Sequence, residues 1–112
     1  MGGDVADAPG EFEQLVLLAI LQLRADAYAS ALRARIQDDA QRKVTRGALY
    51  ATLDRLTAKG WVDWAVEDTT PERGGIPRRC FSVTPAGIDA ARRSYTAVRT
   101  LADGLDDVLG KA

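Results

Sequence analysis

Val44-Thr45-Arg46-Gly47-Ala48-Leu49-Tyr50-Ala51-Thr52-Leu53-Asp54-Arg55-Leu56 is the stretch that decides the fold of this 112-residue chain. Leu49, Leu53 and Leu56 fall at i, i+4 and i+7, which predicts a helix with one apolar stripe. The opposite face is small at its centre and carries an aromatic and a cationic side chain at its edges: Gly47, Ala51, Asp54, Tyr50 and Arg55. Such a face can lie close against a partner.

A two-stranded hairpin is predicted directly after this helix. Thr45 is placed to cap the helix N-terminus, and Gly60 is placed to end it. Segments 61–67 and 79–83 alternate apolar and polar side chains, as half-buried strands do, and segment 68–78 contains the glycines and prolines of a loop. The side chains that we expect to face the core are Trp61, Val62, Trp64, Val66, Phe81 and Val83. A helix followed by such a hairpin indicates a winged helix-turn-helix, mainly α-helical with a small β-wing.

Two further helices are predicted before this unit. The first covers about residues 11–24, and its centre, 15–21, is apolar on every face, although a surface helix needs only one apolar stripe. It is therefore either a central core helix or a helix clamped between its own domain and a partner subunit. The second covers about residues 29–40 and has Asp26 as its candidate cap. Its buried stripe consists of Tyr28, Leu32 and Ile36.

A last helix is predicted to start at Thr84, as N-cap, with Pro85 in the first turn. We expect it to reach about Leu109, although Gly104 weakens it by roughly 1 kcal/mol. Apolar side chains recur along it at spacings of three and four, which is a heptad seam: Ile88, Ala91, Tyr95, Val98, Ala102, Leu105 and Leu109. This helix either folds back on its own domain or pairs with a second chain. The length of the seam, at the end of an otherwise complete unit, favours pairing.

Charge is unevenly distributed along the chain, although the net charge is only −1. Residues 1–41 hold 3 basic and 7 acidic side chains, whereas residues 42–79 hold 8 basic and 5 acidic ones. The basic surplus therefore lies on the predicted helix and hairpin. Local charge, and not the overall balance, sets the attraction of a surface to phosphates.

Composition excludes several classes of function. The chain has no histidine, which removes the commonest general base and metal ligand, and it has neither paired carboxylates at catalytic spacing nor a phosphate-binding loop. We therefore expect no enzyme, no metal and no cofactor. The single cysteine, Cys80, cannot form an intrachain disulfide, and no apolar run is long enough to span a bilayer, so we expect a cytoplasmic protein. Cys80 is expected to face outward as a small strand residue, with a thiol sensor as the alternative.

Three motifs occur in order along the chain. An apolar first helix (15–21) is followed by the pattern Gly-x-Leu-Tyr-x-x-Leu-x-Arg-Leu at 47–56, with Gly60 after it, and by Gly-x-Pro-Arg-Arg and an aromatic strand at 75–84. Together they resemble the PadR family of transcriptional regulators over about residues 13–109. The chain departs from the family pattern where Arg46 replaces a usual proline, Cys80 an aromatic residue and Ala27 a glycine.

The resemblance implies a winged helix-turn-helix with a single C-terminal dimerisation helix, the short form of the family. It implies a flexible arm (1–9), a DNA-binding domain (10–84) and a dimerisation helix (85–112). The expected function is a sequence-specific regulator that binds double-stranded DNA as a homodimer, a repressor released by a small aromatic effector. Some drug-binding relatives place a tryptophan midway along the last helix. Here Tyr95 and Val98 mark the expected effector site and offer a weaker stacking surface.

The residues expected to contact DNA lie on the third helix and on the wing: Lys43, Thr45, Arg46, Tyr50, Ala51, Arg55, Arg73, Arg78 and Arg79. Alternatives remain open for three of them. Tyr50 can instead be half-buried against the wing, Arg55 can lie in a surface ion pair, and Arg79 can simply flank its strand. The expected dimer interface combines the heptad seam with the first helix: Leu15, Leu18, Ile88, Ala91, Tyr95, Val98, Ala102, Leu105 and Leu109.

A second function remains open for this fold. A winged helix can serve as a protein-interaction module without direct DNA binding, using an acidic or apolar face. The arginines of the wing and of the third helix argue against that function.

Overall fold

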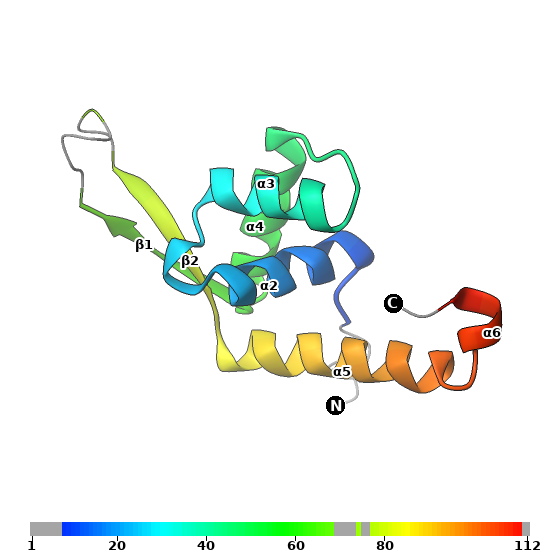
Figure 1. Cartoon of the computed structure of the whole chain (residues 1–112). Helices are drawn as coiled ribbons and strands as arrows, with labels where there is room; N and C mark the ends of the chain where they lie inside the picture. The colour runs from blue at the N-terminus through cyan, green and yellow to red at the C-terminus, as the bar shows by residue number, and fades with distance from the viewer. Residues whose placement is uncertain (1–7, 69–73, 75–76, 111–112) are drawn as a thin grey trace.

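The computed structural model describes residues 8–68, 74 and 77–110, and it shows a helical body from which a two-stranded hairpin projects (Figure 1). The order of elements is the one predicted, which confirms a mainly helical winged fold. The elements are α2 (Glu11–Leu23), a 3₁₀ turn η1 (Arg24–Asp26), α3 (Ala29–Asp39), α4 (Arg46–Ala58), β1 (Val62–Glu67), β2 (Arg78–Val83), α5 (Pro85–Ala102) and α6 (Asp106–Leu109).

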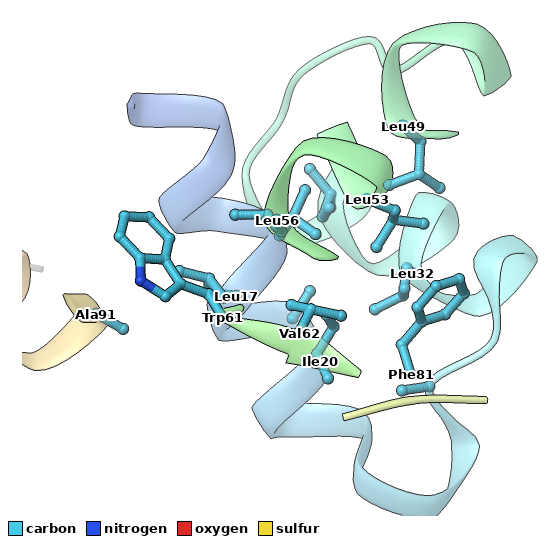
Figure 2. Packing of buried hydrophobic residues seen from close by; sticks show 14 of the residues in the cluster. Leu17, Ile20, Leu32, Leu49, Leu53, Leu56, Trp61, Val62, Phe81 and Ala91 are labelled. Atoms are coloured by element: carbon cyan, nitrogen blue, oxygen red, sulfur yellow. The ribbon is translucent and has the colours of Figure 1, made fainter. Parts of the chain in front are cut away.

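The core lies where α2, α3 and α4 meet the base of the hairpin. Leu49, Leu53 and Leu56, the predicted stripe of α4, are almost completely buried. Figure 2 shows this stripe facing the other apolar side chains of the cluster, among them Leu32 of α3 and Phe81 of β2. Burying a leucine side chain contributes roughly 1.5–3 kcal/mol. The stripe therefore fixes the rotation of α4 and turns its opposite face to solvent.

Both predicted threonine caps are present. The hydroxyl oxygen of Thr45 accepts a hydrogen bond from the backbone N–H of Ala48 at 3.1 Å, and that of Thr84 accepts one from Gly87 at 3.1 Å. Gly60 lies just past the end of α4 with φ +78°, a conformation that glycine adopts without strain. The start and the end of α4 are thus both defined by residues that the sequence indicated, through the Thr45 side chain and the Gly60 backbone.

Gly87 permits a close approach of α5 to the start of β1. A Cβ atom at Gly87 would overlap the carbonyl oxygen of Trp61 and lie 2.7 Å from the side chain of Val83. The same carbonyl accepts a hydrogen bond from the backbone N–H of Thr84 at 2.9 Å. The first turn of α5 is therefore docked against the base of the wing, and Trp61 is buried, as predicted.

The last helix is shorter than the sequence predicts. α5 ends at Ala102, Gly104 adopts φ +82°, and the single turn α6 follows as a separate element. A residue at positive φ cannot continue a right-handed helix. The prediction of one helix up to Leu109 is therefore wrong, and the heptad seam is interrupted before Leu105.

Asp26 does not cap α3, which corrects a second prediction. It belongs to the 3₁₀ turn that follows α2, and the N-cap position is occupied by Tyr28, whose side chain makes no capping hydrogen bond. The turn leaves Asp26 before the N-cap position of α3 and not at it. Leu32 and Ile36 are buried as predicted, whereas Tyr28 is only half-buried.

The wing strands are buried only at their base. β1 and β2 are antiparallel, with Val62 opposite Val83 and Trp64 opposite Phe81. Val62 and Phe81 are buried, but Trp64 is 43 % exposed and Val66 is 61 % exposed, contrary to prediction. The alternation of the strand is correct, yet the hairpin projects beyond the helices (Figure 1), so its outer half has no core to face.

The segment before α3 lies against the free edge of β2. The backbone N–H of Phe81 donates to the carbonyl oxygen of Ala27 at 2.9 Å, and Tyr28 forms an isolated bridge with Cys80. Cys80 is half-buried, and its thiol lies 3.4 Å from the carbonyl oxygen of Ala25. Cys80 lies on the face of β2 opposite the buried Phe81, as expected of an outward strand residue, but it is half-buried because a third backbone segment covers this edge.

One side of α2 remains uncovered within the chain. Its centre is apolar all round, and Val16, Leu17 and Ile20 are buried, but Leu18 and Leu21 each remain more than a third exposed. None of the helices in the described ranges is both long enough and apolar enough to cross a membrane.

Candidate nucleic-acid interface

The solvent-facing side of α4 is shallow. Gly47, Ala51, Asp54 and Ala58 share this side, and all four are exposed. A Cβ atom added at Gly47 would meet nothing within 4 Å, so packing inside the chain does not require glycine there. With short side chains along its centre, α4 can approach a broad surface closely.

Arg46 and Tyr50 lie on one edge of this face. Arg46 is the first residue of α4, is exposed and has no hydrogen bond or ion pair to another described residue. Tyr50 is half-buried, as in the alternative that the sequence left open, but it packs against the core cluster. The guanidinium at the helix start is therefore available to a ligand.

A groove separates α3 and the start of α4 from the wing. It has a volume of about 770 Å³, and among its described lining residues there are four arginines and no carboxylate. Among the described residues only Arg78 has a carboxylate beside it, that of Glu67, so the lining keeps an excess of positive charge. Such an excess attracts anions, and a concave, low-dielectric wall strengthens that attraction. The lining residues include Arg33, Arg46, Tyr50, Val66, Arg78 and Arg79.

Arg33 is a groove residue that sequence reasoning missed. Its Nε donates to the carbonyl oxygen of Val44 at 2.7 Å, and the backbone N–H of Val44 donates to Oε1 of Gln37 at 3.2 Å. These two hydrogen bonds hold the segment between α3 and α4 against α3. Arg33 therefore positions the start of α4 while it adds charge to the groove.

A cluster of three side chains lies where the wing meets the segment before α3. The hydroxyl of Tyr28 donates to both carboxylate oxygens of Glu67, at 2.7 and 2.8 Å. The guanidinium of Arg78 lies 3.4 Å above the centre of the Tyr28 ring, and its Nη2 is 3.6 Å from Glu67. The hydrogen bond to Glu67 raises the pKa of Tyr28 above its usual value of 10. Arg78, which was expected to grip a phosphate, is thus engaged within the protein.

Arg79 and Lys43 are the other predicted cations in the described residues. The guanidinium of Arg79 lies 4.6 Å from the centre of the exposed Trp64 ring, and Lys43 is exposed just before α4. The hydroxyl of Thr45 is used for capping. Arg73 lies outside the described residues. The arrangement brings Arg46, Tyr50, Arg78 and Arg79 to one groove, and it leaves Arg55 apart from them.

Arg55 lies on the other edge of α4, beside a buried carboxylate. Glu13 of α2 is only 8 % exposed, and its carboxylate is 3.7 Å from Nε of Arg55 and 3.0 Å from Nζ of Lys59. The backbone N–H of Gly10 also donates to it, at 2.8 Å. Burial raises the pKa of Glu13, but the Gly10 hydrogen bond and the two cations outweigh this effect and hold the pKa below 4.5. Arg55 therefore lies in an ion pair, the alternative that the sequence left open.

The outward face of α5 is strongly apolar beyond its second turn. Tyr95, Val98 and Leu101 are 52, 65 and 79 % exposed. Ala91, predicted for a dimer interface, is instead buried against α2 of the same chain, where Nε2 of Gln14 donates to its carbonyl oxygen at 3.0 Å. Ala91 packs inside the chain because α5 crosses α2 at this turn.

The described residues contain no group of three or more histidine, cysteine, aspartate or glutamate side chains that could hold a metal ion. The side chains that line the groove include four guanidinium groups and two phenols, those of Tyr28 and Tyr50. Such groups are suited to holding phosphates.

Comparison with known proteins identifies the fold and the family. The model described as "Transcriptional regulator PadR-like family" matches residues 17–93, which is more than half of the chain. No curated protein matches the chain.

Several solved structures share the fold. A PadR family transcriptional regulator from Eggerthella lenta is 26 % identical, with 91 % of this chain and 88 % of that chain covered and a TM-score of 0.66. A PadR-like transcriptional regulator from Bacillus cereus is 16 % identical, covers 90 % and 93 % of the two chains, and has a TM-score of 0.71. The expected family resemblance is confirmed.

Proposed function

Because the chain belongs to the PadR-like family of transcriptional regulators, we propose that it binds a specific DNA duplex as a homodimer and represses transcription there. The observation that carries the proposal is the groove lined by four arginines, of which only Arg78 is paired with a carboxylate in the described part of the chain, directly beside the shallow face of α4. A DNA backbone supplies regularly spaced anions, and neutralising them releases counterions. In this arrangement the arginine-lined groove of the protein holds the phosphates of one DNA strand, and α4 lies in the adjacent major groove of the DNA.

In this proposal α4 enters the major groove with its glycine- and alanine-bearing side. Arg46, at the helix start, contacts a phosphate or a guanine, and Tyr50 contacts a phosphate or a thymine methyl group. Arg79 on the wing contacts the backbone beside the groove. Two such units in a dimer read half-sites about one helical turn apart.

The second copy covers the apolar face of α5 together with Leu18 and Leu21 of α2. Large apolar side chains exposed to this extent mark candidate interaction sites. The seam is shorter than the heptad pattern suggested, because it ends at Ala102. The predicted contacts of Tyr95 and Val98 remain part of it, whereas Ala91 serves the packing inside each chain.

Repression then follows from mass action, since a bound dimer in the cytoplasm excludes polymerase from the operator. A small aromatic effector would bind between the paired helices near Tyr95 and Val98. It releases DNA only if it binds more tightly to a dimer geometry that no longer fits two grooves. No catalytic step is part of this function.

The experiment is selection of duplexes from a random library, followed by fluorescence anisotropy of the selected duplex and of a scrambled one over a series of salt concentrations. Arg46→Ala should weaken binding and reduce the log–log salt slope by about 0.9, the value for one phosphate contact. Arg92→Ala is the matched control, because Arg92 is an exposed arginine on α5 that pairs with Asp89. Its slope should equal that of the wild type.

Two results would refute this function. One is that neither library nor scrambled duplex binds at low salt, which would favour the protein-interaction module. The other is that Arg92→Ala and Arg46→Ala reduce affinity and slope equally, which would mean that only overall charge matters and that α4 has no special role.

A further inference from the structure

We propose that Tyr28, Glu67 and Arg78 form a latch that holds the wing at a fixed position against the start of α3. Glu67 is then a positioning residue for DNA binding, although it carries the same sign of charge as DNA. This inference rests on the proposed function for its consequence at DNA, but the latch itself can be tested without DNA.

The three side chains join three separate segments of the chain. Tyr28 is the N-cap residue of α3, Glu67 is the last residue of β1, and Arg78 is the first residue of β2. Glu67 and Arg78 are also opposite each other in the strand register. The phenol, the carboxylate and the guanidinium thus tie both wing strands to the helix-turn-helix at one point.

The wing needs such a tie because its outer half has no core beneath it. A two-stranded hairpin is marginally stable in isolation. Nearer the body, β2 is held by the Phe81–Ala27 backbone hydrogen bond, but Trp64 and Val66 are exposed. The latch lies at the outer end of the described sheet, where it is best placed to limit bending of the hairpin.

The latch also sets the place of a cation at the groove. Arg78 is held between the Tyr28 ring and the Glu67 carboxylate, and its Nε atom is buried with no hydrogen-bond partner in the described part of the chain. A buried, unpaired N–H is costly, so other contacts must keep the guanidinium there. The stacking and the ion pair supply them, and Arg79, the next residue, is presented toward Trp64.

The test compares Tyr28→Phe and Glu67→Gln with Asp63→Asn. Asp63 is exposed and lies on the same face of β1 as Glu67, so its variant removes the same charge without touching the latch. In free protein, we expect amide hydrogen exchange in residues 78–83 to become about tenfold faster in the two latch variants and to stay unchanged in Asp63→Asn. In the double variant Tyr28→Phe/Glu67→Gln, the second change should add little, because both remove one interaction.

Binding of the selected duplex provides the second readout. Tyr28→Phe changes no charge, and we expect about tenfold weaker binding with an unchanged salt slope, because the wing must then be ordered on binding. Glu67→Gln should bind about tenfold more weakly than Asp63→Asn. If Glu67 only repels DNA, the two charge variants gain affinity equally, and the latch is refuted. Hydrogen exchange equal to wild type in Tyr28→Phe refutes it even when no duplex binds, whereas absent DNA binding with faster exchange refutes only the proposed function.

Discussion

Replacing the buried carboxylate of Glu13 by an amide tests the link between α2 and α4. Glu13→Gln keeps the shape of the side chain and an acceptor for the Gly10 N–H, but it removes the charge that faces Lys59 and Arg55. A hydrogen bond to a charged group contributes about 1.5–3 kcal/mol. Both cations are more than a third exposed and recover part of their hydration, so we expect a loss of about 1.5 kcal/mol in the free energy of unfolding.

The loss should depend on pH with a defined sign. Because the pKa of Glu13 is lower in the folded protein than its ordinary value of 4.5, the ionised carboxylate stabilises the folded state above that value. This stability is lost as the pH falls through the folded pKa. The difference between wild type and Glu13→Gln should therefore be full at pH 7 and shrink steadily below pH 4.5.

The assay is urea unfolding followed by tryptophan fluorescence, at one fixed protein concentration so that association does not vary. Lys59→Met and the double variant complete a mutant cycle, in which we expect a coupling of about 1 kcal/mol at pH 7. A difference between wild type and Glu13→Gln that is as large at pH 3 as at pH 7 would refute the electrostatic reasoning. Zero coupling with Lys59 would show that the carboxylate acts through Gly10 and Arg55 without Lys59.

Three further changes test other parts of the structure. Gly87→Ala should lower the free energy of unfolding by about 1–3 kcal/mol, because the added Cβ would overlap the Trp61 carbonyl. Urea unfolding measures this loss, and a stability equal to that of the wild type would contradict the close approach. Gly47→Ala is the matched control, because nothing lies near its added Cβ, and it should raise the free energy of unfolding by about 0.5 kcal/mol. A lower free energy of unfolding would mean that other atoms occupy the space beside Gly47. Light scattering should give the wild-type protein twice the chain mass of 12.1 kDa, as expected of the proposed dimer, and should give Val98→Asp the mass of a monomer. A dimer that persists in Val98→Asp would place the interface elsewhere.

The sequence predicted the features that depend on local signals. The caps at Thr45 and Thr84 and the buried stripe of α4 each arise within a few residues, and the structure contains them. Gly104 was recognised as a weak point in the last helix, but its propensity cost of roughly 1 kcal/mol did not indicate a complete break. The break follows from its positive φ, which the sequence does not specify.

The features that the sequence did not predict depend on tertiary placement. Alternation correctly assigned Trp64 to one face of β1, but whether a core lies under that face depends on how far the hairpin projects. Glu67 and Tyr28 are 39 residues apart, and neither belongs to a pattern that indicates their contact. The ion pair of Arg55 was weighed as an alternative, yet its partner on the first helix could not be identified without the packing of α2 on α4.

The charges at the two ends of the molecule have a kinetic consequence for the proposed binding of DNA. The wing, with Arg78 and Arg79, and α6, with Asp106 and Asp107, lie at opposite ends of the chain (Figure 1), whose longest dimension is 52 Å. In the proposed encounter with DNA, the polyanion attracts the wing and repels α6, so each chain experiences a torque that turns the wing toward the duplex before contact. A larger fraction of diffusional encounters then occurs with the wing facing the duplex. The association rate, more than the lifetime of the complex, should fall as salt shortens the screening length.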